Sequence, residues 1–298
     1  MIGESAALGA AICWVFSAVL YKRALADSEP LSANTVRCLE TSLALTLAFV
    51  FVGKFWVMTA LPLQVLVMAC VSGVVGMGLG DTLYMISLKI LGVSRAVPIT
   101  CTYPLFSLVW ASLIVGETIT FQVVVGVLAI VFGIWLLSIE KPDKNAEDKD
   151  SKLRVKGVIF AISTAIAWSI SISLVNLAVQ ETTSFEQAYA INTIRITAVA
   201  ISLLVYAFIS KRKLDFLKVK AKTAVTLLTG GLIAIGLGWF LLTLSFLYIP
   251  EAQAVPISST TPLFSTLMGI AFLREKVTTK IAVGSVMVVL GIFLIFIV

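Results

Sequence analysis

Residues 96–107 (AVPITCTYPLFS) and residues 254–265 (AVPISSTTPLFS) decide the fold, because the second stretch repeats the first. Nine of their 12 positions are identical, and the two stretches lie 158 residues apart. The same offset aligns three further pairs: residues 34–37 with 192–195, residues 78–80 with 236–238, and Glu117 with Glu275. Shared apolar composition does not produce this agreement, so the chain consists of two copies of one unit.

The composition is that of a membrane protein. Of 298 residues, 59% are hydrophobic and 13% are charged, and the mean hydropathy is +1.06. Soluble domains carry about a quarter charged residues. The net charge of +6 does not indicate nucleic-acid binding, because the Lys and Arg residues lie in short gaps between apolar runs rather than on one exposed face.

The chain contains ten apolar segments of the length that crosses a bilayer, about 20 residues each. The expected fold is therefore all-α, a polytopic membrane protein with ten transmembrane helices. The polar stretch 140–156 is expected to be a disordered linker between a first repeat, 1–139, and a second repeat, 157–298. The predicted spans are 3–21, 31–53, 61–88, 96–115, 119–138, 157–178, 187–209, 223–247, 252–273 and 280–298.

Five crossings per repeat predict that the two repeats are inverted. An odd number of crossings, followed by a linker that does not cross, makes the second repeat enter the membrane from the opposite side. Two equivalent units of opposite orientation can exchange conformations and open a shared site first to one side and then to the other. The repeat therefore predicts alternating access.

The basic residues predict the orientation. Nineteen of the 22 Lys and Arg residues fall in gaps on one side, the other side has Lys54, and Arg37 and Arg195 lie inside spans. By the positive-inside rule, the linker is cytoplasmic and both termini face outward. We expect a multi-pass protein of the cell (plasma) membrane.

A Pro-Leu-Phe helix, then Gly-Glu or Arg-Glu, then a glycine-spaced final helix occurs at 104–133 and again at 262–291. This pattern resembles the EamA repeat of the drug/metabolite transporter superfamily over nearly the whole chain. The resemblance implies a ten-helix carrier akin to bacterial exporters of amino acids and metabolites, and more distantly to nucleotide-sugar and triose-phosphate translocators. It also implies a central cavity lined mainly by helices 1, 3, 4, 6, 8 and 9. The resemblance implies cytoplasmic termini, as in many relatives, whereas the charges of this sequence predict that both termini face outward.

Four charged residues lie inside the predicted spans, where charges are costly and usually paired or functional. Arg37 and Arg195 are repeat equivalents that either snorkel or pair within the fold, or attract an anionic group of a substrate. Glu40, one turn after Arg37, is expected to form an intrahelical ion pair with it. Asp81, whose repeat partner is Trp239, is either the counter-ion of Arg37, a proton-coupling site, or a contact for a substrate amine.

Helices 4 and 9 each contain two prolines, Pro98 with Pro104 and Pro256 with Pro262, which are expected to bend the helices and act as hinges. The hydroxyls between them either repair the bends or bind solute. Tryptophans at similar places in the two repeats are candidate walls of the site. The predicted substrate-binding residues are Trp14, Asp81, Tyr84, Thr100, Tyr103, Trp168, Trp239, Ser258 and Thr261. Glu117 and Glu275 are expected to stabilise the starts of the last helices.

The chain has no histidine, its four cysteines are scattered, and it contains no Walker or GxGxxG motif. No metal, cofactor or enzymatic activity is therefore expected. The predicted function is secondary transport of an amino acid, a related metabolite or a drug-like compound, as export, and either proton-coupled or by exchange. The alternatives are a membrane-embedded enzyme and a non-transporting regulatory protein. The expected partners are a small-molecule substrate and the lipid bilayer, without nucleic acid, in a monomer or homodimer.

Overall fold

The computed structural model describes residues 1–91, 96, 99–139, 151–209, 215–264, 267 and 278–296. Within these residues the chain is helical and contains no strand. Five helical segments of this part are long and apolar enough to cross a membrane: Ile2–Tyr21, Leu63–Leu91, Lys152–Gln180, Phe185–Ile209 and Ala221–Ser245. Three shorter apolar helices are Tyr103–Val115, Phe121–Leu136 and Thr279–Ile295.

The elements of the first half are α1 (Ile2–Ala24), α2 (Pro30–Phe51), α3 (Phe55–Thr59), α4 (Leu63–Gly73), the π-helix η1 (Val74–Gly80), α5 (Asp81–Leu91), α7 (Tyr103–Trp110), the π-helix η2 (Ala111–Val115) and α8 (Phe121–Ile139). Those of the second half are α9 (Ser151–Gln180), α10 (Phe185–Ile209), the 3₁₀ turn η3 (Asp215–Lys218), α11 (Ala221–Gly231), the π-helix η4 (Leu232–Trp239), α12 (Phe240–Ser245), α13 (Glu251–Ser258) and α15 (Thr279–Phe296).

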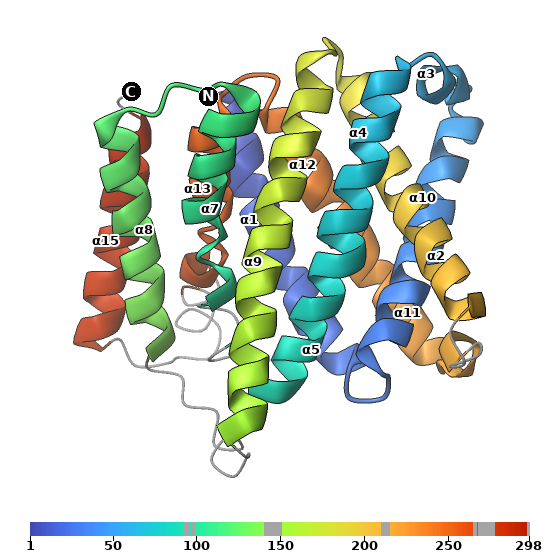
Figure 1. The fold of residues 1–298 in the computed structure, drawn as a ribbon, viewed down its shortest axis with the longest axis horizontal. Coiled ribbons are helices and arrows are strands. Elements are labelled where there is room, and N and C mark those ends of the chain that lie inside the picture. Colours follow the sequence, from blue (N-terminus) through green and yellow to red (C-terminus); the bar gives the residue numbers. More distant parts are fainter. Residues whose placement is uncertain are drawn as a thin grey trace.

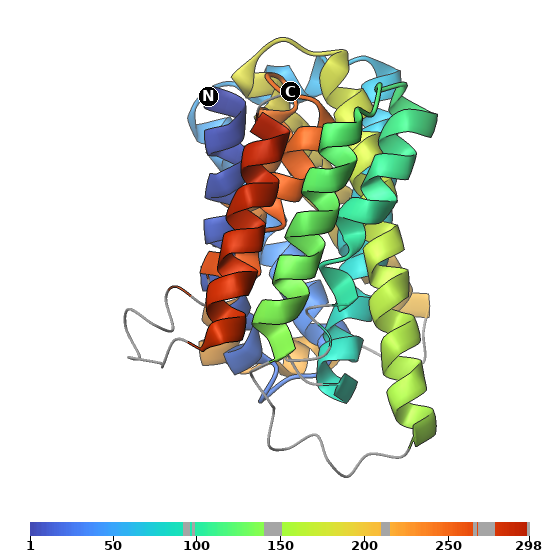
Figure 2. The same ribbon diagram turned by 90° about the vertical axis from the view of Figure 1, so that its left-hand side faces the viewer.

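The first helices of the two halves, α1 and α9, run through the bundle in opposite directions. The N- and C-terminal marks lie at one end of the molecule, and α8 ends and α9 begins toward the other end (Figures 1 and 2). Helix α1 therefore runs away from the end that carries the termini, whereas α9 runs toward it.

Helices of each half pack against helices of the other half. Helix α1 lies against α11, η4 and α12 of the second half, and α9 lies against α4, η1 and α5 of the first half. Helix α2 also packs on α10, and α8 on α15. The first helix of each repeat thus contacts the third helix of the other repeat.

Glycines permit this close packing. A Cβ atom on Gly80 would lie 2.8 Å from Cδ1 of Trp168 on α9, and one on Gly238 would lie 2.8 Å from Nε1 of Trp14 on α1. The two glycines are 158 residues apart, so the same contact forms twice. Trp14 and Trp168 therefore occupy equivalent places, as the sequence indicated.

The two segments that carry the paired prolines, predicted to be bent, are each interrupted by a turn. Turns occur at 101–102 and at 259–260, again 158 residues apart. Pro104 lies in the first turn of α7, where its missing N–H leaves no carbonyl unpaired, and Pro256 lies inside α13. Pro262 follows the second turn, while Pro98 and Glu275 lie outside the described residues.

One boundary differs from the expectation. Residues 151–156, assigned above to a disordered linker, form the first turns of α9, and residues 140–150 lie outside the described part. Helix α9 therefore begins with a basic stretch, which contains Lys152 and Arg154, before its apolar residues. Long cationic side chains are compatible with a helix that emerges from a membrane.

We predict opposite effects for alanine at two neighbouring glycines of η1. A Cβ on Gly76 would lie 2.2 Å from Oγ of Ser171, whereas one on Gly78 meets its nearest atom, in Val199, at 3.7 Å. Gly76→Ala should therefore lower the free energy of unfolding by about 1–3 kcal/mol through overpacking. Gly78→Ala should leave it unchanged or raise it by up to about 1 kcal/mol. Thermal unfolding of the detergent-solubilised protein measures both, and equal effects would contradict the packing described.

Candidate functional site

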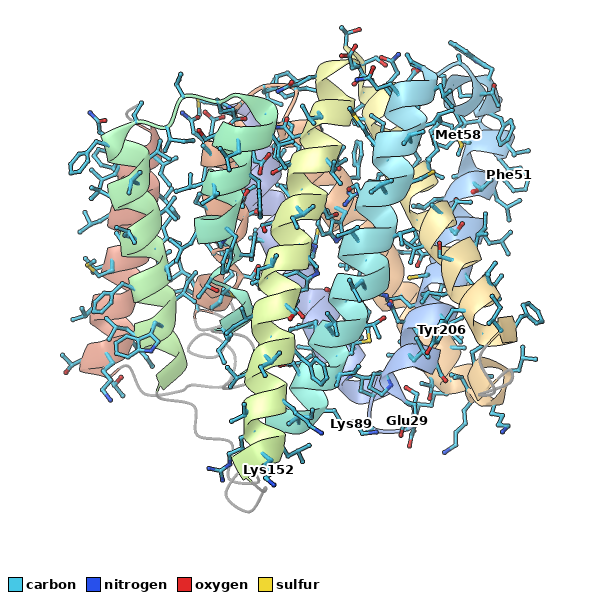
Figure 3. All side chains as sticks on the ribbon, viewed as in Figure 1. Glu29, Phe51, Met58, Lys89, Lys152 and Tyr206 are labelled. Carbon is cyan, nitrogen blue, oxygen red and sulfur yellow. The ribbon has the colours of Figure 1, made fainter. Side chains whose placement is uncertain are left out.

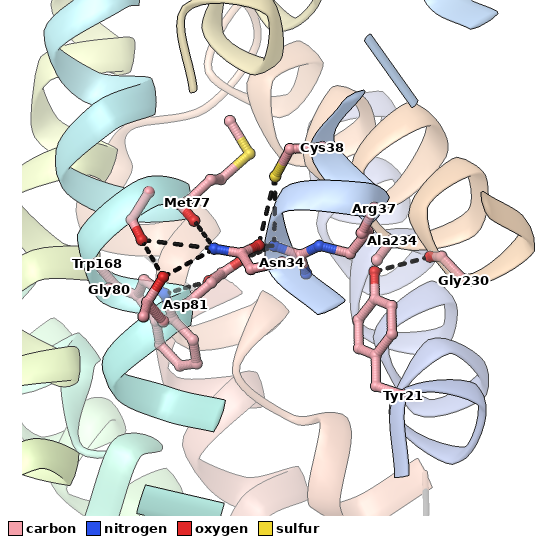
Figure 4. Close-up of polar contacts among 12 residues, drawn as sticks. Tyr21, Asn34, Arg37, Cys38, Met77, Gly80, Asp81, Trp168, Gly230 and Ala234 are labelled. Atoms are coloured by element: carbon pink, nitrogen blue, oxygen red, sulfur yellow. Dashed lines mark hydrogen bonds and ion pairs between the residues drawn. The ribbon is translucent and has the colours of Figure 1, made fainter. Parts of the chain in front are cut away.

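A buried ion pair joins two helices of the first half, and a helix of the second half contacts it. Nη2 of Arg37, on α2, lies 2.6 Å from Oδ2 of Asp81, the first residue of α5, and both residues are buried (Figure 4). The other oxygen of Asp81 accepts a hydrogen bond of 2.8 Å from Nε1 of Trp168 on α9. The guanidinium also lies 5.0 Å from the ring centre of Tyr21 on α1. Four helices therefore converge on one neutral charge pair.

Asn34 completes this cluster. Its Oδ1 accepts a hydrogen bond of 2.5 Å from Arg37, and its Nδ2 donates to the carbonyl of Met77 in η1 at 3.0 Å (Figure 4). In the second repeat, Nδ2 of Asn192 donates to the carbonyl of Ile235 in η4 at 2.8 Å. Both residue pairs are related by the 158-residue offset. An asparagine of α2 thus binds η1, and an asparagine of α10 binds η4. The sequence analysis did not single out these asparagines, although both lie in its aligned motif.

Two of the charge expectations are resolved by these contacts. The predicted intrahelical pair of Arg37 with Glu40 was wrong, because the guanidinium turns to Asp81 on the neighbouring helix. Oε2 of Glu40 has no hydrogen-bond partner, and this side chain lines a groove between α2 and α10 with Thr197. Asp81 has the geometry of a counter-ion to Arg37, one of the roles left open for it.

The second arginine is in a different state. Arg195 is 0% exposed, its Nη2 donates to Oγ of Ser171 at 3.2 Å, and its Cζ lies 4.4 Å from the ring centre of Trp239. Its Nε and Nη1 have no partner, and among the described residues it forms no ion pair. Trp239 occupies the repeat position of Asp81, so an aromatic ring replaces the acid.

The predicted aromatic residues gather in two groups. Trp14 packs edge-on against Trp239, with ring centres 5.6 Å apart. Trp168 lies 5.1 Å from Tyr84 and 6.0 Å from Tyr103. The first group adjoins Arg195 and the second adjoins Asp81, so each aromatic group has one charged neighbour.

The predicted hydroxyl residues mostly bond to backbone. Oγ of Ser258 and Oγ1 of Thr260 donate to the carbonyls of Val255 and Ile257, three residues earlier. Oγ1 of Thr261 lies 3.3 Å from the carbonyl of Ala11, and Thr100 is buried. Of the two roles considered for the hydroxyls, repair of the helix break is the one that these contacts favour. Oγ of Ser258 also lies 3.4 Å from the Tyr103 hydroxyl.

Two glutamates near the end that carries the termini were not predicted as a cluster. Glu251 is 0% exposed and accepts hydrogen bonds from Ser107 at 2.5 Å, Ser173 at 2.7 Å and Asn176 at 3.3 Å. It immediately follows Pro250, at a position that the hydropathy pattern assigned to a connection.

Glu117 stabilises a helix start, as expected, but not that of the helix that follows it. Its oxygens accept the backbone N–H groups of Glu251 at 2.7 Å and Ala252 at 2.9 Å. It therefore caps α13 of the other repeat. This long-range contact has no signal in local sequence.

Comparison with known proteins identifies the family. Residues 1–139 and 155–297 match the EamA-like transporter family. The chain belongs to this family. An uncharacterized transporter of Archaeoglobus fulgidus is 22% identical to this EamA-like protein over 288 residues, which cover 96% of the chain and 95% of the relative. One protein of known crystal structure has a similar fold, with a TM-score of 0.76 at 16% identity over 98% of this chain and 95% of that one. The EamA-like protein is a multi-pass membrane transporter.

We predict that the Arg37–Asp81 pair is strongly coupled. Arg37→Gln or Asp81→Asn should each lower the free energy of unfolding by about 3–5 kcal/mol, because each leaves a buried charge without its partner. The double variant should regain a large part of that loss. Thermal unfolding of the four proteins in detergent gives the coupling energy, and Glu40→Gln serves as a control with no ion pair to break. Additive losses in the double variant would show that the pair is not coupled.

A second stability prediction concerns the cap of α13. Glu117→Ala removes the acceptor of two backbone N–H groups and should lower the free energy of unfolding by about 1–2 kcal/mol. Glu186→Ala is the control, since its ion pair with Lys54 is more than 40% exposed on both sides and should contribute at most about 1 kcal/mol. Chemical unfolding in detergent compares the two variants, and a larger loss in the control would refute the capping role.

Proposed function

We propose that this EamA-like protein is a secondary transporter that moves a small organic solute by alternating access. In this proposal ten transmembrane helices form two inverted five-helix repeats, residues 1–139 and 157–298, joined by residues 140–156, of which 151–156 already belong to α9. The solute is an amino acid, a related metabolite or a drug-like compound, and net movement is export. No motif for ATP binding is present in the sequence, so the energy comes from a gradient.

The single observation that carries the proposal is the doubled contact between repeats. Trp14 covers Gly238 and Trp168 covers Gly80, so the first helix of each half lies on the third helix of the other. Two equivalent interfaces of opposite direction can alternate between tight and open, which is the geometric requirement for alternating access. Each interface contains one π-helix, since Gly80 belongs to η1 and Gly238 belongs to η4. π-Helical segments are frequent at functional sites.

The charge distribution supports an orientation. Lys89 and Lys152 both lie at the end opposite the termini, while Phe51 and Met58 lie at the other end (Figure 3). Because cytoplasmic ends of membrane proteins carry the excess of Lys and Arg, we assign the lysine-rich end to the cytoplasm and both termini to the outside of the plasma membrane.

The solute site in this proposal lies between the two aromatic groups. Trp14 with Trp239 and Trp168 with Tyr84 and Tyr103 supply apolar walls, and the two arginine clusters supply charge. Asp81 already accepts from Arg37 and Trp168, which supports a counter-ion role. We therefore favour exchange of solutes over a proton carried by Asp81 as the mode of coupling.

Reconstituted liposomes test the transport proposal. Vesicles preloaded with an unlabelled solute should accumulate the same labelled solute by counterflow, without a pH gradient and without ATP. Product formation in place of flux would support an enzyme, and neither outcome across a broad solute panel would support a regulatory protein. If an imposed pH gradient is required for flux, and Asp81→Asn abolishes that flux in protein that remains folded, proton coupling replaces exchange.

Epitope tags test the inverted arrangement. A tag before Met1 and a tag near residue 145 should be accessible from opposite faces of intact cells, with only the first exposed to the medium. Exposure of both tags on one face would overturn the inverted repeats and the alternating-access proposal with them.

A further inference from the structure

The two copies of the Asn-Thr-x-Arg motif are satisfied unequally. In the first copy, residues 34–37, Oδ1 of Asn34 accepts a hydrogen bond from Arg37, and the guanidinium is neutralised by Asp81. Among the fully buried polar atoms of Asn34, Arg37 and Asp81, only Nε of Arg37 lacks a hydrogen-bond partner. The first copy is therefore almost complete without any added molecule.

The second copy, residues 192–195, lacks both of those contacts. Oδ1 of Asn192 has no partner, and neither do Nε and Nη1 of Arg195. Asn192 and Arg195 are both 0% exposed, and Nδ2 of Asn192 already donates to the carbonyl of Ile235. One helical turn of α10 thus presents a buried acceptor and a buried cationic donor that the protein leaves unsatisfied.

The replacement of an acid by an aromatic ring explains the missing anion. The position that holds Asp81 in the first repeat holds Trp239 in the second, and the Arg195 guanidinium lies over its ring. A cation–π contact stabilises a guanidinium but does not neutralise it or satisfy its N–H groups. A buried charge is stable only when it is paired, and a carboxylate matches a guanidinium with two parallel hydrogen bonds.

We propose that Asn192 and Arg195 bind the transported solute, with the carboxylate of the solute on Arg195 and a donor on its neighbouring carbon on Oδ1 of Asn192. This chemistry selects small carboxylic acids that carry an amino or a hydroxyl group at the second carbon. The indole rings of Trp239 and Trp14 lie where they cover the apolar body of such a solute. The inference rests on the proposed transport function and names its substrate class.

The packing of η1 explains how the site is closed. A Cβ on Gly73 would lie 2.3 Å from the carbonyl oxygen of Arg195, and one on Gly76 would lie 2.2 Å from Oγ of Ser171, which binds the guanidinium. The end of α4 and the start of η1 therefore cover the motif directly. In this proposal the solute enters when the α4–η1 segment separates from α9 and α10, which exposes Arg195 while the Arg37–Asp81 pair stays closed.

The first arm of the test compares the stability of two arginine variants in the full-length protein in detergent. Arg37→Gln should lower the melting temperature, because it leaves Asp81 without its counter-ion. Arg195→Gln should leave the melting temperature unchanged or raise it, because it removes a buried charge that has no counter-ion. A fall after Arg195→Gln as large as that after Arg37→Gln would assign Arg195 a structural role and overturn the inference.

The second arm measures ligand binding with four probes that share one aromatic body. L-phenylalanine and L-3-phenyllactate carry the carboxylate and a donor beside it, 3-phenylpropanoate carries the carboxylate alone, and 2-phenylethylamine carries the amine alone. The first two should raise the melting temperature and bind about tenfold more tightly than 3-phenylpropanoate. They should bind about 100-fold more tightly than 2-phenylethylamine. Tighter binding of L-phenylalanine would indicate amino acids as the substrate class, and tighter binding of L-3-phenyllactate would indicate hydroxy acids.

The variants connect this binding to Arg195. Arg195→Gln should abolish the preference for carboxylates, and Arg195→Lys, which keeps the charge without the planar fork, should weaken carboxylate binding about tenfold. A wild-type protein stabilised only by the amine, or by none of the four probes, would overturn the inference, as would unchanged carboxylate binding in Arg195→Gln.

Liposome counterflow separates this inference from the transport proposal. Flux of a carboxylate-free solute that is equal in wild type and Arg195→Gln would leave the transporter standing and remove the site. Arg195-dependent carboxylate binding without flux of any solute would keep the site and remove the transport proposal.

Discussion

A guanidinium buried inside a membrane protein is costly unless an anion pairs with it, and this constraint organises the polar contacts between the helices. Arg37 meets Asp81 across the interface of α2 and α5, and Trp168 of α9 holds the second oxygen of the acid. Because both halves contribute to this cluster, moving one half against the other changes the surroundings of a buried charge. The hydrogen bond from Trp168 to Asp81 therefore links the buried ion pair to the interface between the two halves.

The helices can approach these charges closely because their facing residues are small and their backbone is locally unwound. Gly76 and Gly80 face Ser171 and Trp168 on α9, with no space for a side chain. The π-helical turns depart from the regular α-helical pattern, and Asn34 and Asn192 donate to carbonyls within them, those of Met77 and Ile235. A side chain of the neighbouring helix therefore ties each π-turn to that helix.

Features with a local or repeated signal in the sequence were predicted well. The 158-residue offset identified the equivalent glycines and the two arginines, and the paired prolines predicted bends in the two segments where turns occur at 101–102 and 259–260. Features that depend on which side chain reaches across an interface were not predicted. Glu40 was paired with Arg37 by its spacing of one turn, yet the guanidinium contacts Asp81, 44 residues away in the sequence. Glu251 and its cap Glu117 join segments 134 residues apart, so no local pattern signals them. The start of α9 was misplaced because charge composition was read as disorder.

The two repeats have similar helices but differ in their side chains. The difference at one position, Asp81 in the first repeat and Trp239 in the second, produces two kinds of site. With an acid at position 81, the first Asn-Thr-x-Arg motif is closed by the protein itself and functions as a structural cluster. With Trp239 at the equivalent position, the second motif keeps its helix and its asparagine contact to η4 but loses its counter-ion. Two identical motifs would each carry their own acid, and neither would have reason to bind an external anion. A single substitution between the copies therefore accounts for a fold that is nearly symmetric and a charge distribution that is not, and it makes the second copy the one that an anion from outside the protein completes.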